Sequence, residues 1–354
     1  MKIRLAILES DEEYLNRIVT VFNTRFPDRL ECYSFTDEAY ALSKLVEEKI
    51  QVFVASDYFD IDTAKIPQNC GFAYFVDSPE METLKDHPAI CRFQKADLIF
   101  RQILSIYAEH AGDYSELKLS EDGCRTIIFA STGGGGGTSI MAAACALHFA
   151  AQGNKTFYLN LEPFGSADDF FKAEGQFDMS DVIFALKTRK ANLAMKLESC
   201  VKQDPRGVSF LSAPKLALHM MELTSEETVQ LIKQLRSGKK YQYLIVDTGF
   251  DLREESMQVL KQGSAIVLVG SGTTTSNTKL HRAVSALAAL EQDGNERLSD
   301  RIVVAYNRFS SKVGTVDDKI GLRVVGGAPR YEHATTEQLL EQLSMNGLFD
   351  EILK

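Results

Sequence analysis

A run of five glycines stands between an apolar segment and an alanine-rich one. The run and its neighbours read Ser131-Thr132-Gly133-Gly134-Gly135-Gly136-Gly137-Thr138-Ser139. Residues 126–130 before it are typical of a buried strand, and residues 140–152 after it are typical of a helix. This order predicts a phosphate cradle, because glycines let backbone N–H groups turn around an anion and the helix directs the positive end of its dipole there. The Thr138 hydroxyl stands where such a loop binds Mg²⁺.

The loop lacks the lysines that usually accompany such glycines. A P-loop of the type G-x-x-x-x-G-K-[ST] has a lysine directly before the hydroxyl residue, and Gly137 stands there. The loop resembles the K-G-G-x-G-K-[ST] variant of the MinD/ParA group, whose first lysine is here Thr132. Backbone amides each contribute roughly 1.5–3 kcal/mol to holding a charged group, whereas losing a group that stabilises developing charge slows a reaction roughly 10²–10³-fold. We therefore expect ATP to bind and ATPase activity to be weak or absent.

A carboxylate ends another apolar segment further along the chain. Residues 243–246 are Tyr-Leu-Ile-Val, and Asp247 follows them. A P-loop protein uses a buried strand of this kind to bring one aspartate to the Mg²⁺ beside the loop. Asp247 and Thr138 are therefore the predicted Mg²⁺ ligands. The triplet Asp247-Thr248-Gly249 also resembles the Asp-Thr-Pro that follows this strand in MinD-like proteins.

Two further strand ends resemble motifs of the MinD/ParA group. Residues 159–163 read Leu-Asn-Leu-Glu-Pro where that group has Asp-x-Asp-Pro, whose carboxylates help to orient the attacking water. Asn160 and Glu162 are therefore the catalytic candidates, although an amide cannot take a proton. Residues 302–308 resemble the strand ending in Asn-Arg, so the resemblance implies that Asn307 binds the adenine edge.

The first 108 residues alternate strand-like and helix-like segments and carry acidic residues at the predicted strand ends. This layout resembles a response-regulator receiver domain, in which the resemblance would make Asp57 the phosphoacceptor. Ser10 replaces one acidic residue of that pattern and removes an oxygen ligand that Mg²⁺ favours. The fifth strand lacks the Lys-Pro of that pattern, and either Arg92 or Lys95 could supply its positive charge. Both a non-phosphorylated interaction module and a working phosphoacceptor stay open.

Alternating strands and helices predict an α/β protein of two doubly wound domains. We expect an atypical receiver-like (flavodoxin-like) domain at 1–108 with five strands separated by helices, and a helix at 36–48 capped by Thr36. Residues 109–124 are polar and turn-rich and are predicted to be a linker. A P-loop ATPase domain with a mostly parallel sheet should span 125–354, with one continuous helix at 180–200.

Receiver-like domain, linker and deviant MinD/ParA-type ATPase domain together resemble the TadZ/CpaE proteins, which localise the tight-adherence (Flp) pilus secretion apparatus. The resemblance covers nearly the whole chain. It implies a homodimer holding ATP and Mg²⁺, partners in the pilus apparatus and recruitment to a cell pole.

Composition limits the other functions. The net charge is −10, which argues against direct binding of DNA. Six scattered cysteines without a C-x-x-C pair indicate a reducing compartment, and the sequence has neither a signal-peptide core nor a membrane-length apolar run, so we expect a cytoplasmic protein. The tail at 337–354 is amphipathic but acidic, so it should pack on the domain or on a partner instead of on anionic lipid.

Two other functions stay open. The first is an active ATPase switch that cycles between monomer and dimer, which needs cations from elsewhere in the chain. Lys187, Arg189 and Lys190 are candidates for such cations, although a solvated helix face explains them better. The second is a dinucleotide-binding enzyme with Glu162 on a ribose, although no register of the loop gives G-x-G-x-x-G.

Overall fold

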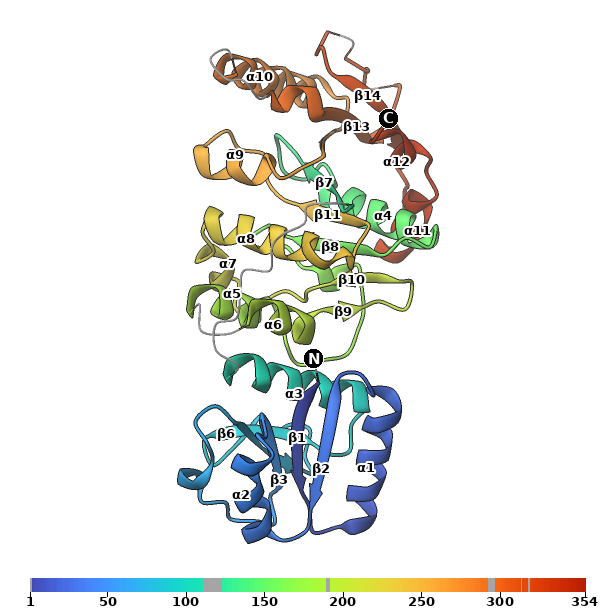
Figure 1. Cartoon of the computed structure of the whole chain (residues 1–354). Helices are drawn as coiled ribbons and strands as arrows, with labels where there is room; N and C mark the ends of the chain where they lie inside the picture. Colours follow the sequence, from blue (N-terminus) through green and yellow to red (C-terminus); the bar gives the residue numbers. More distant parts are fainter. Residues whose placement is uncertain (1, 111–122, 189–191, 292–296, 313, 318) are drawn as a thin grey trace. The chain divides into compact units, whose positions relative to one another are not determined.

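The computed structural model describes residues 2–110, 123–188, 192–291, 297–312, 314–317 and 319–354. The chain divides into two compact units (Figure 1). The first comprises Met1–Glu116 and Phe184–Cys200, and the second comprises Leu117–Ile183 and Val201–Lys354. The first unit therefore includes a segment from within 125–354. Most of the predicted linker, 111–122, lies outside the described residues.

The first unit is built on a mostly parallel sheet with the strand order β2-β1-β3-β4-β6-β5. Helices α1 and α3 cover one face of this sheet, and helix α2 covers the other, so each face has its own apolar core. The elements are β1 Ile3–Leu8, α1 Glu12–Arg25, β2 Leu30–Phe35, α2 Glu38–Glu47, β3 Val52–Ser56, β4 Gly71–Val76, β5 Thr83–Leu84, β6 His87–Cys91 and α3 Ala96–His110.

The expected alternation of strands and helices is confirmed as far as β3 and again for the closing helix α3, and it is wrong between β3 and β6. Between β3 and β4 the chain forms only the short 3₁₀ turn η1, Thr63–Lys65. Between β4 and β6 it forms the short strand β5, which is antiparallel to β6. Only ten residues, 77–86, separate β4 from β6, and Lys85 and Asp86 both have positive φ (50° and 64°). Such a pair makes a tight hairpin turn, which leaves no room for a crossover helix.

Two helix boundaries also differ from the predictions. Helix α2 is capped by Asp37, whose carboxylate accepts from the Tyr40 N–H at 2.7 Å, and not by Thr36. The predicted helix at 180–200 is two helices, α5 Met179–Thr188 and α6 Leu193–Cys200. Asn192 is not helical, and its side chain accepts from the Met195 N–H at 3.2 Å. Asn192 therefore caps the start of α6 instead of continuing a helix through this position.

The second unit has an eight-stranded sheet with the order β14-β13-β12-β7-β11-β8-β10-β9. Every pairing is parallel except that of the edge strand β9 with β10. The strands are β7 Arg125–Ala130, β8 Thr156–Asn160, β9 Lys202–Gln203, β10 Val208–Phe210, β11 Tyr243–Asp247, β12 Ala265–Gly270, β13 Ile302–Phe309 and β14 Arg323–Pro329. The carboxyl ends of the parallel strands meet at one edge of the sheet, where ligands of such folds bind.

Helices cover both faces of this sheet (Figure 1). The first layer holds α4 Thr138–Ala151, α11 Thr336–Ser344 and α12 Leu348–Glu351, and the second holds α8 Ser225–Arg236, α9 Glu254–Leu260 and α10 Thr274–Leu290. The predicted capping box of α8, formed by Thr224 and Glu227, is confirmed. The acidic tail packs on its own domain, as expected. Its buried side chains in the core are Leu340, Leu343, Leu348, Phe349 and Ile352.

Candidate functional site

The glycine loop joins β7 to α4 as the sequence predicts. Gly135 and Gly137 have φ of 80° and 78°, in the left-handed region that glycine adopts without strain. The Ser131 hydroxyl accepts from the Gly133 N–H at 3.1 Å and donates to the Gly133 carbonyl at 2.5 Å, which fixes the start of the loop. Gly137 precedes the first turn of α4, whose N–H groups have no intrahelical partners. The loop can therefore bind an anion through its backbone.

The position of the missing lysine at Gly137 is closed by Asn307. A Cβ atom at Gly137 would lie 2.3 Å from the Asn307 Nδ2 atom. That amide group donates to the Gly136 carbonyl at 3.0 Å and to the Gly137 carbonyl at 3.3 Å. The Asn307 Oδ1 atom accepts from the Arg308 N–H at 2.9 Å. Asn307 thus joins β13 to the loop through its side-chain amide. Its contact with adenine stays a prediction, and none of these hydrogen bonds tests it.

Asp247 ends β11 beside the loop strand and beside β8. Its backbone is paired with Phe129 on one side and with Asn160 on the other. The carboxylate is fully buried, and its Oδ2 atom accepts from the Tyr158 hydroxyl at 2.9 Å and from the Asn160 amide at 3.2 Å. Burial, followed by the charge of Glu162, raises the Asp247 pKa to about 7. Tyr158 and its bond to Asp247 are features that the sequence analysis missed.

Asn160 and Glu162 lie next to this carboxylate, as predicted. The Asn160 amide donates to Tyr158 as well as to Asp247, and its Oδ1 atom accepts from the Glu162 N–H at 3.0 Å. The Glu162 carboxylate accepts from the Ser139 hydroxyl at 3.3 Å. The structure therefore brings together the loop, Asp247, Asn160 and Glu162. Both polar atoms of the Asn160 side chain, however, already make hydrogen bonds to other residues of the chain.

The residues here fit a Mg²⁺ ion. The Asp247 Oδ1 atom is buried and makes no hydrogen bond of normal geometry to any described residue, since the nearby Ser139 hydroxyl bonds Glu162. A hard cation would satisfy that oxygen. Thr138 and Asp247 are the residues that would hold the ion, which would supply positive charge to phosphate oxygens. The described part of the chain contains no cluster of three or more His, Cys, Asp or Glu that could form an all-protein metal site.

A cavity of about 900 Å³ adjoins the glycine loop. Four basic side chains and a single carboxylate line it: Lys279, Arg308, Lys312, Arg330 and Glu332. The sequence analysis missed these bases as cations of the loop because they come from α10, from the end of β13 and the residues after it, and from the residue after β14, far along the chain. Of the cations that it named, Lys187 does not line this cavity, and Arg189 and Lys190 lie outside the described residues.

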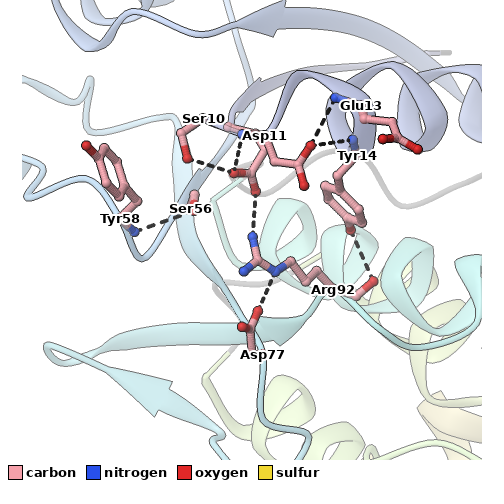
Figure 2. Close-up of polar contacts among 9 residues, drawn as sticks. Ser10, Asp11, Glu13, Tyr14, Ser56, Tyr58, Asp77 and Arg92 are labelled. Carbon is pink, nitrogen blue, oxygen red and sulfur yellow. Dashed lines mark hydrogen bonds and ion pairs between the residues drawn. The ribbon is translucent and has the colours of Figure 1, made fainter.

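The strand ends of the first unit form a different kind of site (Figure 2). Glu9 follows β1 and is fully buried, and its Oε2 atom accepts from Arg92 Nη1 at 3.2 Å. The same guanidinium donates through Nε to Asp77, which follows β4. The other Glu9 oxygen accepts from the Asp11 N–H at 3.1 Å. Of the two basic candidates, Arg92 is the one that reaches the acidic group.

Asp57 lies just after β3, in an exposed turn. Its backbone N–H donates to the Phe75 carbonyl at 3.0 Å. Within the described residues its carboxylate has neither a hydrogen bond nor an ion pair. The last residue of β3, the buried Ser56, is the one in register with Glu9, because Leu8 pairs with Ala55. The role of Asp57 as phosphoacceptor stays a prediction.

The model of the family described as "TadZ-like, receiver domain" matches residues 1–108. The first 108 residues are a TadZ-like receiver domain. No curated protein matches the chain.

The remainder of the chain has the fold of ParA and MinD ATPases. A ParA family ATPase from Chlorobium tepidum is 20% identical, with a TM-score of 0.52, over 65% of this chain and 96% of that one. A chain of the MinC:MinD complex from Aquifex aeolicus is 16% identical, with a TM-score of 0.50, over 64% and 93%. MinD of Pyrococcus horikoshii complexed with Mg-ADP is 15% identical, with a TM-score of 0.48, over 62% and 94%. Identities this low show the fold alone.

Proposed function

We propose that this protein is an ATP- and Mg²⁺-binding localisation scaffold of a Flp (tight-adherence) pilus secretion apparatus. The nucleotide holds a homodimer together and is hydrolysed little or not at all. The observation that carries this proposal is the pairing of a TadZ-like receiver domain with a glycine loop that keeps its backbone frame and lacks both lysines. The protein works in the cytoplasm, is recruited to a cell pole, and binds apparatus proteins instead of DNA.

Binding without turnover follows from the groups around the loop. The first N–H groups of α4 can bind phosphates, and the unpaired Asp247 Oδ1 atom supports a Mg²⁺ ion between Asp247 and Thr138. Asn160 has no free polar atom to orient an attacking water, because its side chain bonds Asp247, Tyr158 and the Glu162 N–H. Glu162 is the one predicted catalytic residue that keeps a partly exposed carboxylate. A general base must lie within hydrogen-bond reach of the attacking water, and a single half-buried carboxylate is a weak provision for that.

The receiver domain contributes a docking surface in this proposal. The bonding of Arg92 to Glu9 and Asp77 supports a module that keeps one conformation without phosphorylation. Among the described residues, no helix is long and apolar enough to cross a membrane.

A single-turnover assay tests the proposal directly. Full-length protein in excess over labelled ATP with Mg²⁺ should retain the label as intact ATP, and sedimentation velocity should show a dimer that depends on the nucleotide. Steady release of phosphate that Asp247→Ala abolishes would overturn the scaffold and favour the ATPase switch. Absence of any retained nucleotide would leave only the receiver domain as a functional site.

The ATPase switch remains the second candidate because bases outside the loop line the adjoining cavity and could complete the site. A dinucleotide-binding enzyme is less well supported. The Glu162 carboxylate that would bind a ribose accepts a hydrogen bond from Ser139 of the loop helix.

A further inference from the structure

Lys279 brings a positive charge to the glycine loop from a distant helix. A Cβ atom at Gly133 would lie 3.0 Å from the Lys279 Nζ atom and 3.4 Å from its Cδ atom. The lysine stem thus passes directly over the first glycine of the loop. Lys279 is exposed, and within the described residues its ammonium group makes no hydrogen bond or ion pair. Its stem therefore lies along the loop while its ammonium group stays open to solvent or to a ligand.

Arg308 approaches the other end of the loop. Its Nη1 atom donates to the Gly135 carbonyl at 3.0 Å. Its φ of 55° is left-handed, which is uncommon for a side chain of this kind. The Asn307 side chain supports this backbone turn by accepting from the Arg308 N–H. The two cations therefore lie along the same loop, at Gly133 and at Gly135, on the side that lines the cavity.

The cavity is positive on a protein that is acidic overall. Its lining has four basic residues and one carboxylate, Glu332, whereas the whole chain has a net charge of −10. The remaining polar lining consists of loop backbone and of hydroxyls such as Ser271, Thr273 and Ser276. A concave site with converging cations, N–H groups and hydroxyls selects a phosphorylated ligand.

We propose that Lys279 supplies the ammonium group that contacts the phosphates of a bound nucleoside triphosphate, in place of the lysines missing at Thr132 and Gly137, with Arg308 as the second cation. The inference rests on the proposed nucleotide binding. A lysine cannot return to position 137, where φ is positive and Asn307 occupies the space of its Cβ. A long side chain from α10 reaches the loop without disturbing that contact.

Titration of the full-length protein with ATP and Mg²⁺ tests this assignment. Lys279→Ala should weaken ATP binding about 10- to 100-fold, because one charge-assisted contact to phosphate is lost. Arg282→Ala is the matched control, since Arg282 is also exposed on α10 and does not line the cavity. It should leave the affinity unchanged. Both residues are exposed, and thermal unfolding should confirm that each variant folds as the wild type does.

Competition by inorganic tripolyphosphate identifies the part of the nucleotide that Lys279 contacts. Tripolyphosphate should compete with ATP in the wild type, and Lys279→Ala should weaken this competition by the same factor as ATP binding. Wild-type affinity for ATP in Lys279→Ala, an equal loss in Arg282→Ala, or unchanged competition by tripolyphosphate would overturn the inference and leave nucleotide binding intact. A wild type that binds no nucleotide would instead overturn the proposed function on which the inference rests.

Discussion

The two mostly parallel sheets of this protein differ in how the charged side chains near their strand ends are bonded. In the receiver domain Arg92 is enclosed, with 18% of its side chain exposed, and bonds Glu9 and Asp77. In the ATPase-like domain Lys279 and Arg308 are exposed and face a cavity of about 900 Å³. Each site lacks residues of the motif that it resembles, yet one is closed by an internal ion pair and the other stays open. A site that binds a phosphorylated ligand needs cations that are not already neutralised by acidic side chains of the protein.

The largest expected effect comes from opening the closed site. Arg92→Ala would leave Glu9, which is fully buried, without its cation and should lower the free energy of unfolding by about 3–5 kcal/mol. The denaturation midpoint of the full chain measures the loss, and hydrogen exchange of β1 and β6 assigns it to this domain. Arg25→Ala is the control, because the Arg25–Asp97 pair has 54% and 60% of its side chains exposed and should contribute under about 1 kcal/mol. Equal losses in the two variants would mean that the Arg92 pair is no more than a surface contact.

Asp247, the buried acid beside the glycine loop, should oppose folding at neutral pH when no cation is present. Because the folded-state pKa of Asp247 is raised to about 7, its charged form is disfavoured, and its contribution to stability falls as pH rises from about 4 to 7. Each unit of pKa shift is worth about 1.4 kcal/mol, so Asp247→Asn should gain a few kcal/mol on the wild type between pH 5 and 8. Denaturation midpoints in chelator at both pH values measure this gain.

Asp251→Asn is the control for that measurement. Its backbone bond from Arg253, together with the Arg253 side chain, lowers the Asp251 pKa. The carboxylate is therefore charged in both states across this range, and its replacement should shift stability equally at pH 5 and pH 8. A wild-type curve parallel to that of Asp247→Asn would show that Asp247 is already ionised in the apo protein.

Restoring the signature lysine at the end of the loop should harm the open site. Gly137→Lys places a side chain at φ 78° with its Cβ atom against Asn307, which should cost about 1–3 kcal/mol of stability. ATP binding should weaken and not tighten, as titration would show. Gly134→Lys is the control for the stability cost alone, because nothing lies within 4 Å of a Cβ atom there and its φ is not left-handed. Tighter ATP binding by Gly137→Lys would contradict this expectation and would mean that the Asn307 side chain moves away from the loop at little cost.

The glycine loop, the buried strands and their mostly parallel pairing could be predicted from the sequence, because strand, loop and helix each have a local sequence pattern. Asp247 and Asn160 end their strands and Glu162 follows one, as predicted, while their roles in Mg²⁺ binding and catalysis stay predictions. Lys279 could not be found in this way, since its proximity to Gly133 depends on how α10 packs. The bonding of Asn307 to the loop likewise depends on the approach of β13.

The receiver domain shows the same limit from the other side. Its first strands and helices have clear periodicity, and they were predicted correctly. A hairpin at β5 stands where a helix was expected, because Lys85 and Asp86 adopt positive φ. Neither residue type predicts a positive φ from the sequence alone. The choice between Arg92 and Lys95 depended on which side chain turns inward to Glu9, and spacing along the chain does not determine that.

The smallest expected effect concerns Asp57, which tests whether the closed site still does receiver chemistry. Acetyl phosphate with Mg²⁺ should leave the mass of the protein unchanged, and Asp57→Asn should alter stability by less than about 0.5 kcal/mol, because its carboxylate is exposed. Phosphoryl transfer needs a cation to balance the charge of the reacting group. Here Glu9 offers no free oxygen for that cation, since one accepts from Asp11 and the other from Arg92. A phosphoryl adduct that Asp57→Asn removes would show that Arg92 gives way to Mg²⁺, and the receiver domain would then be a working switch instead of a fixed docking module.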